Sequence, residues 1–219
     1  MTDLEQVEKQ FDRFAQQISF SRVSDDVGSS PRFSNADYVD KRRRIVIELK
    51  ILDTEYFPRG GIIESMNSII VQPTNINEDG TGQYEFLLPK LNREGKHDSF
   101  EEPLRRVLKK ANKQIRETKE YYKYSSENLG FLIIAQLGLQ SLSPEVTVNL
   151  AHRLLIKEFS SIDGVLVCTP NGSLVDPTTI RSNPEAVNIG RSDKLNAYEI
   201  INRIGEQWLD FYLKGGHSS

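Results

Sequence analysis

Residues 45–52, IVIELKIL, alternate almost without interruption between two sets of apolar side chains, with two charges in one set. Side chains on a β-strand point alternately to opposite faces. Glu48 and Lys50 therefore share one face with Val46 and Leu52. The opposite face is filled by Ile45, Ile47, Leu49 and Ile51. A strand this apolar is typical of a central position in a sheet that is covered on both sides.

A shorter apolar stretch, residues 36–39, lies just before this strand and contains Asp37. The charged residues 40–44 separate the two stretches. A tight reversal there predicts a hairpin, which brings Asp37 towards Glu48. Charges on a covered strand are rarely left unpaired, so this end of the hairpin is the first candidate for a site.

Helical periodicity of apolar residues predicts four helices, at residues 3–18, 103–124, 143–158 and 195–213. Pro103 suits the first position of the second of these helices, because a proline lacks the N–H that has no helical partner there. Ser143-Pro144-Glu145 similarly gives a cap, a proline at the first position and an early acid.

Continuous apolar runs at 130–137 and 162–168 predict two buried strands. With the helix between them, they imply a right-handed parallel crossover. Residues 19–23 suit a short first strand. Residues 169–194 are rich in proline, asparagine and glycine and predict a long loop.

The stretch 53–102 interrupts this order and is interpreted as an insertion into one domain that spans residues 1–219. Within it, residues 62–71 fit a helical face better than a strand, 84–88 suit a short strand, and 92–99 are charged, which predicts a mobile stretch. The insertion is a candidate for substrate selection or for a dimer contact. The expected fold class is α/β.

Composition excludes several classes of function. The chain has 219 residues and a net charge of −3, so there is no overall basic field, and any nucleic-acid contact needs a local basic patch. The single cysteine, Cys168, excludes an internal disulfide and a cysteine-rich zinc site. No signal segment or apolar run approaching 18 residues occurs, so we expect a cytoplasmic protein with no membrane partner.

A local basic patch is present in residues 103–124, which contain eight basic residues and two acids, Glu117 and Glu120. A basic helix beside a metal site would attract a polyanion and contact its phosphates. The alternative, a solvated helix face with i,i+4 ion pairs, stays open. The candidate nucleic-acid contacts are Arg106, Lys109, Lys110, Lys113 and Arg116, together with Arg43 in the hairpin turn.

Two carboxylates and an ammonium at one end of a buried hairpin are suited to phosphate chemistry. Carboxylate oxygens suit Mg²⁺, which keeps several waters and takes further ligands from a phosphate. Lys50 is placed to orient a water or to neutralise charge developing on phosphorus. The alternative is a solvated Glu48–Lys50 pair on a half-exposed strand.

The arrangement Asp37…Glu48-Leu49-Lys50 resembles the signature of the PD-(D/E)xK nuclease superfamily, with Ala36 in place of the usual proline. The resemblance implies a restriction-endonuclease-like fold, with a mixed central sheet flanked by helices. It implies Mg²⁺, or alternatively Mn²⁺, held by Asp37, Glu48 and the backbone carbonyl of Leu49, with Lys50 positioning the water.

Two further site residues follow from the same resemblance. A first-helix glutamate often reaches the metal in such nucleases, and Glu8 is the candidate. The helix after the Glu-x-Lys strand often carries a Gln or Lys directed at the site, and Gln114 and Lys110 occupy that place.

The resulting expectation is a metal-dependent nuclease that hydrolyses DNA, rather than RNA, in restriction, repair or phage defence. Cutting both strands of a duplex generally needs two sites, which makes a homodimer the expected form for that use. The alternative is a nuclease-like fold that binds nucleic acid or protein without cleavage. A third interpretation is that the motif is a chance match within another α/β module.

Overall fold

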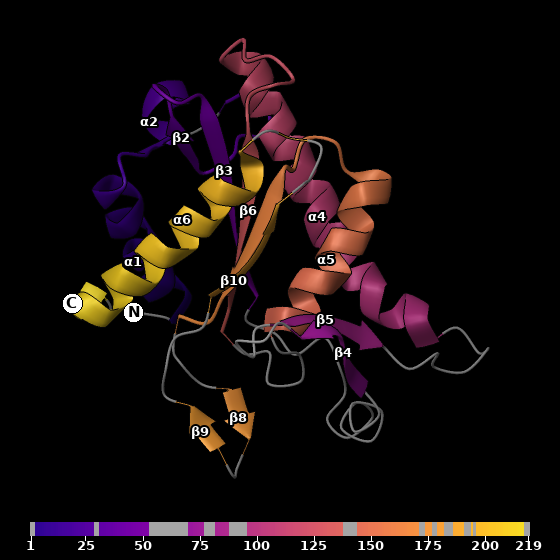
Figure 1. Ribbon diagram of the computed structural model, residues 1–219. Coiled ribbons are helices and arrows are strands. Elements are labelled where there is room, and N and C mark those ends of the chain that lie inside the picture. Colours follow the sequence, from indigo (N-terminus) through magenta and orange to yellow (C-terminus); the bar gives the residue numbers. More distant parts are fainter. Residues whose placement is uncertain are drawn as a thin grey trace.

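The computed structural model (Figure 1) describes residues 3–28, 31–52, 70–76, 82–87, 96–137, 144–170, 174–176, 179–181, 186–190, 194 and 196–216. Its helices are α1 (Asp3–Gln17), α2 (Ser24–Val27), α4 (Lys96–Tyr121), α5 (Pro144–Glu158), α6 (Ala197–Phe211) and the π-helical turn η1 (Tyr212–Gly216). Its strands are β1 (Ser21–Arg22), β2 (Tyr38–Asp40), β3 (Ile45–Leu52), β4 (Ile70–Ile76), β5 (Gly82–Leu87), β6 (Gly130–Gln136), β7 (Gly164–Cys168), β8 (Leu174–Asp176), β9 (Thr179–Arg181) and β10 (Ala186–Gly190).

A six-stranded mixed sheet in the order β1-β2-β3-β6-β7-β10 forms the centre of the protein. The neighbours β3, β6 and β7 run parallel, whereas β1, β2 and β10 pair in antiparallel fashion at the two sides. The predicted α/β class, the hairpin and the parallel pairing of β6 with β7 are confirmed. The hairpin register pairs Asp40 with Ile45 and Tyr38 with Ile47, which leaves residues 41–44 as the turn.

Helices cover both faces of this sheet (Figure 1). On one face, α4 and α5 form a buried cluster with the strands, centred on Leu108, Ile115 and Leu155. On the other face, α1 and α6 form a second cluster, in which the Trp208 and Phe11 rings stack with centroids 4.3 Å apart. Among the described residues, no helix is long and apolar enough to cross a membrane.

The two faces of β3 divide as the alternation predicts. Val46 and Leu52 belong to the cluster beneath α4 and α5, whereas Ile45, Ile47 and Leu49 belong to the cluster beneath α1 and α6. Because Glu48 and Lys50 alternate with Leu49, they point towards the α4 side of the sheet. β3 therefore places two charged side chains in the interface between the sheet and α4.

The start predicted for the basic helix is wrong. α4 begins at Lys96, so Pro103 lies inside the helix, and residues 96–99 of the charged stretch are helical. A proline within a helix removes one backbone hydrogen bond and strains the preceding turn. The apolar stripe on the following turns, with Leu104, Leu108 and Ala111 buried, anchors the helix on the sheet despite that cost.

The predicted loop at 169–194 is also partly wrong, because it contains β8, β9 and β10. β10 is an edge strand with the short sequence AVNIG, whose side chains are only partly buried. β10 is stabilised by its pairing with β7. Because its five residues include both apolar and polar types without a regular alternation, the sequence does not indicate a strand there. Gly190 is required there, since a Cβ would lie 2.6 Å from the Tyr198 backbone.

Two short hairpins complete the described structure, β4 with β5 and β8 with β9. Residues 70 and 71, which the periodicity assigns to a helical face, lie in β4, and β5 covers most of the strand predicted at 84–88. The remainder of the predicted insertion, residues 53–69, 77–81 and 88–95, lies outside the described residues.

Candidate active site

Asp37 lies immediately before β2, and its side chain reaches across to the next strand. Its Oδ2 accepts a hydrogen bond of 2.8 Å from the backbone N–H of Leu49. β2 is only three residues long, so this N–H lies beyond the last strand pair at Tyr38–Ile47. The Asp37 carboxylate thus accepts the hydrogen bond that a residue of a longer β2 would otherwise accept. It does so at Leu49, the residue between Glu48 and Lys50.

Glu48 and Lys50 form an ion pair that is largely removed from solvent. The Lys50 Nζ donates to Glu48 Oε1, and the two side chains are 18% and 1% exposed, respectively. Lys50 Nζ also donates to Gln114 Oε1 over 2.9 Å. The solvated-pair alternative does not describe this site, because the Glu48 side chain is almost completely buried.

Gln114 connects the two halves of the site. Its Oε1 accepts from Lys50, and its Nε2 donates to the backbone carbonyl of Asn35 over 2.9 Å. Because one amide group serves both contacts, it fixes the Lys50 side chain relative to the segment that carries Asp37. Of the two residues predicted for this place, Gln114 occupies it and Lys110 is exposed on the helix surface.

The segment before Asp37 is held on α4 by two more side chains. Glu117 Oε2 accepts from the Ser34 N–H over 2.7 Å, and Thr118 Oγ1 accepts from the Ala36 N–H over 2.8 Å. Residues 114, 117 and 118 lie on one side of a helix, so one helix face anchors three successive residues of an extended chain. α4 thus acts as the support for Asp37 as well as for Lys50.

We expect Thr118→Val to lower the free energy of unfolding by about 1–3 kcal/mol, because it leaves the buried Ala36 N–H without an acceptor while keeping the side-chain shape. Thr118→Ser, which keeps the hydroxyl, should lose less. Urea unfolding followed by circular dichroism measures both. A Thr118→Val protein as stable as the wild type would contradict the assigned role, because valine keeps the methyl group and lacks only the hydrogen-bonding hydroxyl.

Burial raises the pKa of both carboxyl groups, and the charge of Asp37 raises that of Glu48 further. The pKa of Glu48 rises to about 8, first because of burial and then because of the Asp37 charge, with Lys50 opposing both effects. Burial also raises the pKa of Asp37, against the lowering effects of the Leu49 N–H and of Lys50. The two carboxyl groups lie within hydrogen-bonding reach of each other and share a proton most favourably.

The donor set fits a divalent cation. Glu48 Oε2 is buried and has no hydrogen-bond partner among the described residues, although it lies beside a second carboxylate. A cavity of about 280 Å³ on the α1 side of the sheet is lined by Asp37, Leu49, Glu8 and Arg22, among others, so Asp37 borders it and Glu48 does not. Mg²⁺ is commonly bound by one or two carboxylates and completes its shell with waters and phosphate oxygens.

Glu8 is less closely placed than the other predicted ligands. It is exposed on α1 and faces the same cavity as Asp37 and Leu49. Among the described residues, no three acidic, histidine or cysteine side chains are grouped tightly enough to hold a metal. The structure thus brings together Asp37, Glu48 and Lys50 and leaves Glu8 at the rim.

Arg22 is a site residue that sequence reasoning missed. Its guanidinium group forms two hydrogen bonds of 2.7 Å with Asp12, stands over the Tyr38 ring at 5.8 Å from the centroid, and lines the cavity beside Asp37. No motif marks this arginine. The only available signal was its place in the short strand next to the hairpin.

The predicted nucleic-acid contacts are mostly on the surface of α4. Lys109 and Lys110 are exposed, whereas Arg106 pairs with Glu102, Lys113 with Glu117, and Arg116 with Glu117 and Glu120. Arg43 is exposed in the hairpin turn beside Asp40. Lys119, counted among the eight basic residues, is buried against Asp163 and is structural.

The exposed cations are nevertheless arranged along the site. Positions 106, 110 and 113 recur at intervals of four and three residues, which places these cations in one stripe along α4. Gln114, which contacts Lys50, borders this stripe. The i,i+4 ion pairs are solvent-exposed, and such pairs exchange readily for contacts with phosphate.

Comparison of the chain with protein-family models, with curated proteins and with solved structures found no match in any of the three. The function is therefore argued from the geometry of the site.

Proposed function

We propose that the protein is a metal-dependent nuclease that hydrolyses DNA phosphodiester bonds, on a restriction-endonuclease-like version of the observed α/β fold. One observation carries the proposal: Asp37, Glu48 and Lys50 converge at a single, largely buried place, and Asp37 also lines a cavity. A buried carboxylate with an unpartnered oxygen is costly unless it serves a ligand. A second carboxylate at hydrogen-bonding distance raises that cost further.

Each residue has a distinct role in this proposal. Asp37 and Glu48 hold the cation, and the carbonyl of Leu49 is a third candidate ligand from the same strand. Lys50 orients the attacking water and balances the charge that develops on the phosphate oxygens. Gln114 holds the Lys50 ammonium in place through the contact at 2.9 Å. Bound Mg²⁺ would supply Lewis-acid polarisation of the phosphate and lower the pKa of a bound water.

The stripe of cations on α4 favours a nucleic acid as the substrate of the proposed site. Arg106, Lys110 and Lys113 lie along the helix that carries Gln114, so a nucleic-acid backbone laid on this stripe passes the helix turn that contacts Lys50. Contacts of this kind position a strand without selecting its sequence. Their affinity should fall steeply with salt.

The test is cleavage of single-stranded DNA, duplex DNA and RNA of matched sequence by the wild-type protein, with Mg²⁺, with Mn²⁺ and with a chelator. We expect DNA cleavage that requires the metal. Binding of DNA without cleavage under every condition would instead support the non-cleaving binding module. The variants that separate this activity from a contaminating nuclease are Lys50→Ala and Glu48→Gln.

A further inference from the structure

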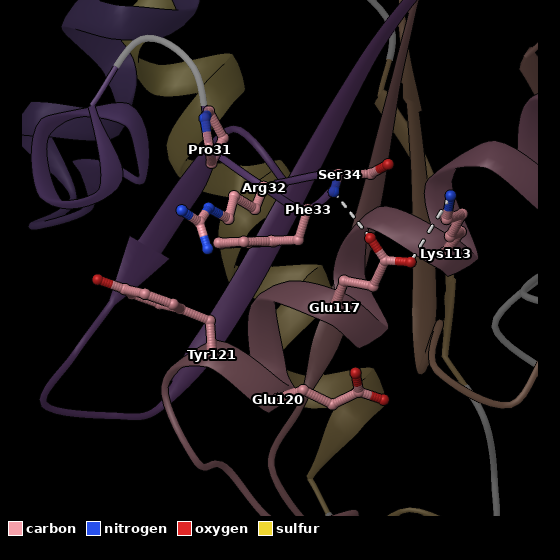
Figure 2. Close-up of a pocket in the computed structure, with 8 residues that line it drawn as sticks. All are labelled: Pro31, Arg32, Phe33, Ser34, Lys113, Glu117, Glu120 and Tyr121. Carbon is pink, nitrogen blue, oxygen red and sulfur yellow. Dashed lines mark hydrogen bonds and ion pairs between the residues drawn. The ribbon is translucent and has the colours of Figure 1, made fainter.

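A second cavity, of about 740 Å³, opens on the surface between α4 and the segment that leads to Asp37 (Figure 2). Its lining is formed by Pro31, Arg32, Phe33, Ser34, Lys113, Glu117, Glu120 and Tyr121. Neither Asp37, Glu48 nor Lys50 belongs to it. The cavity is therefore a separate feature from the proposed catalytic centre, and it shares with that centre only its supporting elements.

An aromatic pair forms one side of this cavity. The rings of Phe33 and Tyr121 are stacked, with centroids 5.1 Å apart and an interplanar angle of 21°. Tyr121 is the more accessible of the two and is 47% exposed. Exposed aromatic rings on a soluble protein supply a flat apolar surface on which a planar group can stack.

Charged groups surround the aromatic pair. Figure 2 shows Glu117 between Lys113 and the Ser34 backbone, with Glu120 one turn further along α4. Arg32 is exposed on the other side, beside Phe33. Cations suit a phosphate backbone, and a carboxylate accepts hydrogen bonds from the exocyclic amine of a base.

The cavity lies close to the proposed catalytic centre, and the short segment from Ser34 to Asp37, which is held on α4, connects the two. Ser34 is three residues from Asp37, which limits their Cα separation to about 11 Å. Glu117 and Gln114, one turn apart on α4, hold the first two residues of this short segment, Ser34 and Asn35. That span corresponds to about three stacked nucleotides, at about 3.4 Å per nucleotide.

We infer that this cavity binds an unpaired nucleobase that stacks on Tyr121, and that the substrate is a DNA strand with a single-stranded segment a few nucleotides from the bond that is cleaved. The inference rests on the proposed function and names the substrate class of that same site. A base within a duplex is stacked on both sides and cannot present its face to Tyr121.

The test compares binding of a fluorescein-labelled single-stranded oligonucleotide and of the blunt duplex of the same sequence by fluorescence anisotropy, with Ca²⁺ as a probe metal. Tyr121→Leu should weaken binding of the single strand at least about fivefold, the lower limit for loss of one base–aromatic stack, and leave duplex binding unchanged. Tyr121→Phe keeps the ring and should bind like the wild type.

Tyr198→Leu is the matched control, because Tyr198 is an exposed tyrosine on α6, which covers the opposite face of the sheet. Equal binding by Tyr121→Leu and the wild type would overturn the inference. So would equal losses for single strand and duplex, which indicate a contact with the backbone alone.

The cleavage assay separates this inference from the proposed function. Metal-dependent cleavage with no effect of Tyr121→Leu on strand binding would leave the nuclease in place and remove the base pocket. Absence of both nucleic-acid binding and cleavage in the wild type would overturn both proposals.

Discussion

Lys50→Ala is expected to lower the rate of Mg²⁺-dependent DNA cleavage by about 100- to 1000-fold, the loss typical of removing one positioned electrostatic group from an active site. The physical reason is the position of the Lys50 ammonium group, which bonds both Glu48 and Gln114 at the bottom of the site. Steady-state cleavage of a fluorescent oligonucleotide under saturating metal measures the effect.

A measurement of DNA affinity should distinguish this loss of catalysis from a general loss of the folded, DNA-binding protein. Lys50 is 18% exposed, so its removal is expected to change DNA affinity much less than cleavage. Lys157→Ala is the matched control, because this lysine is exposed in the last turn of α5. Cleavage by Lys50→Ala at the wild-type rate, in a preparation with a native circular dichroism spectrum, would contradict the assigned role.

Glu48→Gln should abolish metal-dependent cleavage and at the same time stabilise the metal-free protein at alkaline pH. The pKa of Glu48 is raised from 4.5 to about 8 in the folded state, so the folded protein holds a proton that the unfolded chain has released. The stability from Glu48 is therefore complete below pH 4.5 and is lost as pH rises towards 8. A glutamine stays neutral at every pH, so Glu48→Gln does not lose this stability as pH rises.

The stability difference between Glu48→Gln and the wild type should grow between about pH 5 and 8 and then level off, with a total of up to about 4 kcal/mol. Chemical denaturation at several pH values with a chelator present measures it. Glu127→Gln, at an exposed position before β6, should show no such growth. Mg²⁺ should stabilise the wild type and not Glu48→Gln, because the proposed site needs both carboxylates to bind the cation. A stability difference that does not change with pH would show that folding does not raise the pKa of Glu48.

The centre of the site could be predicted from sequence because it depends on local pattern. Strand alternation alone places Glu48 and Lys50 on one face, and the charged residues 41–44 mark the reversal that returns the chain to Asp37. Both features involve residues that are near one another in the chain. The geometry of a hairpin then determines which side chains meet.

The support of the site was only partly predictable. The contacts that hold the Asp37 segment on α4 join Ser34 to Glu117 and Asn35 to Gln114, residues 83 and 79 positions apart. Gln114 was anticipated from the resemblance, but its second hydrogen bond was not. Such pairs leave no periodic signal, because each depends on how a helix lies on a sheet. Burial of Lys119 against Asp163 has the same origin.

The pairing of two carboxylates with one ammonium has a consequence for the order of events. With one proton shared between Asp37 and Glu48, the remaining carboxylate charge balances the Lys50 ammonium, and the metal-free site has no net charge with which to attract a phosphodiester. A divalent cation that displaces this proton would change the site to +1, which a single phosphodiester neutralises. Charge balance thus favours an ordered reaction, in which the cation enters before the nucleic acid and product departure leaves a site ready for the next strand.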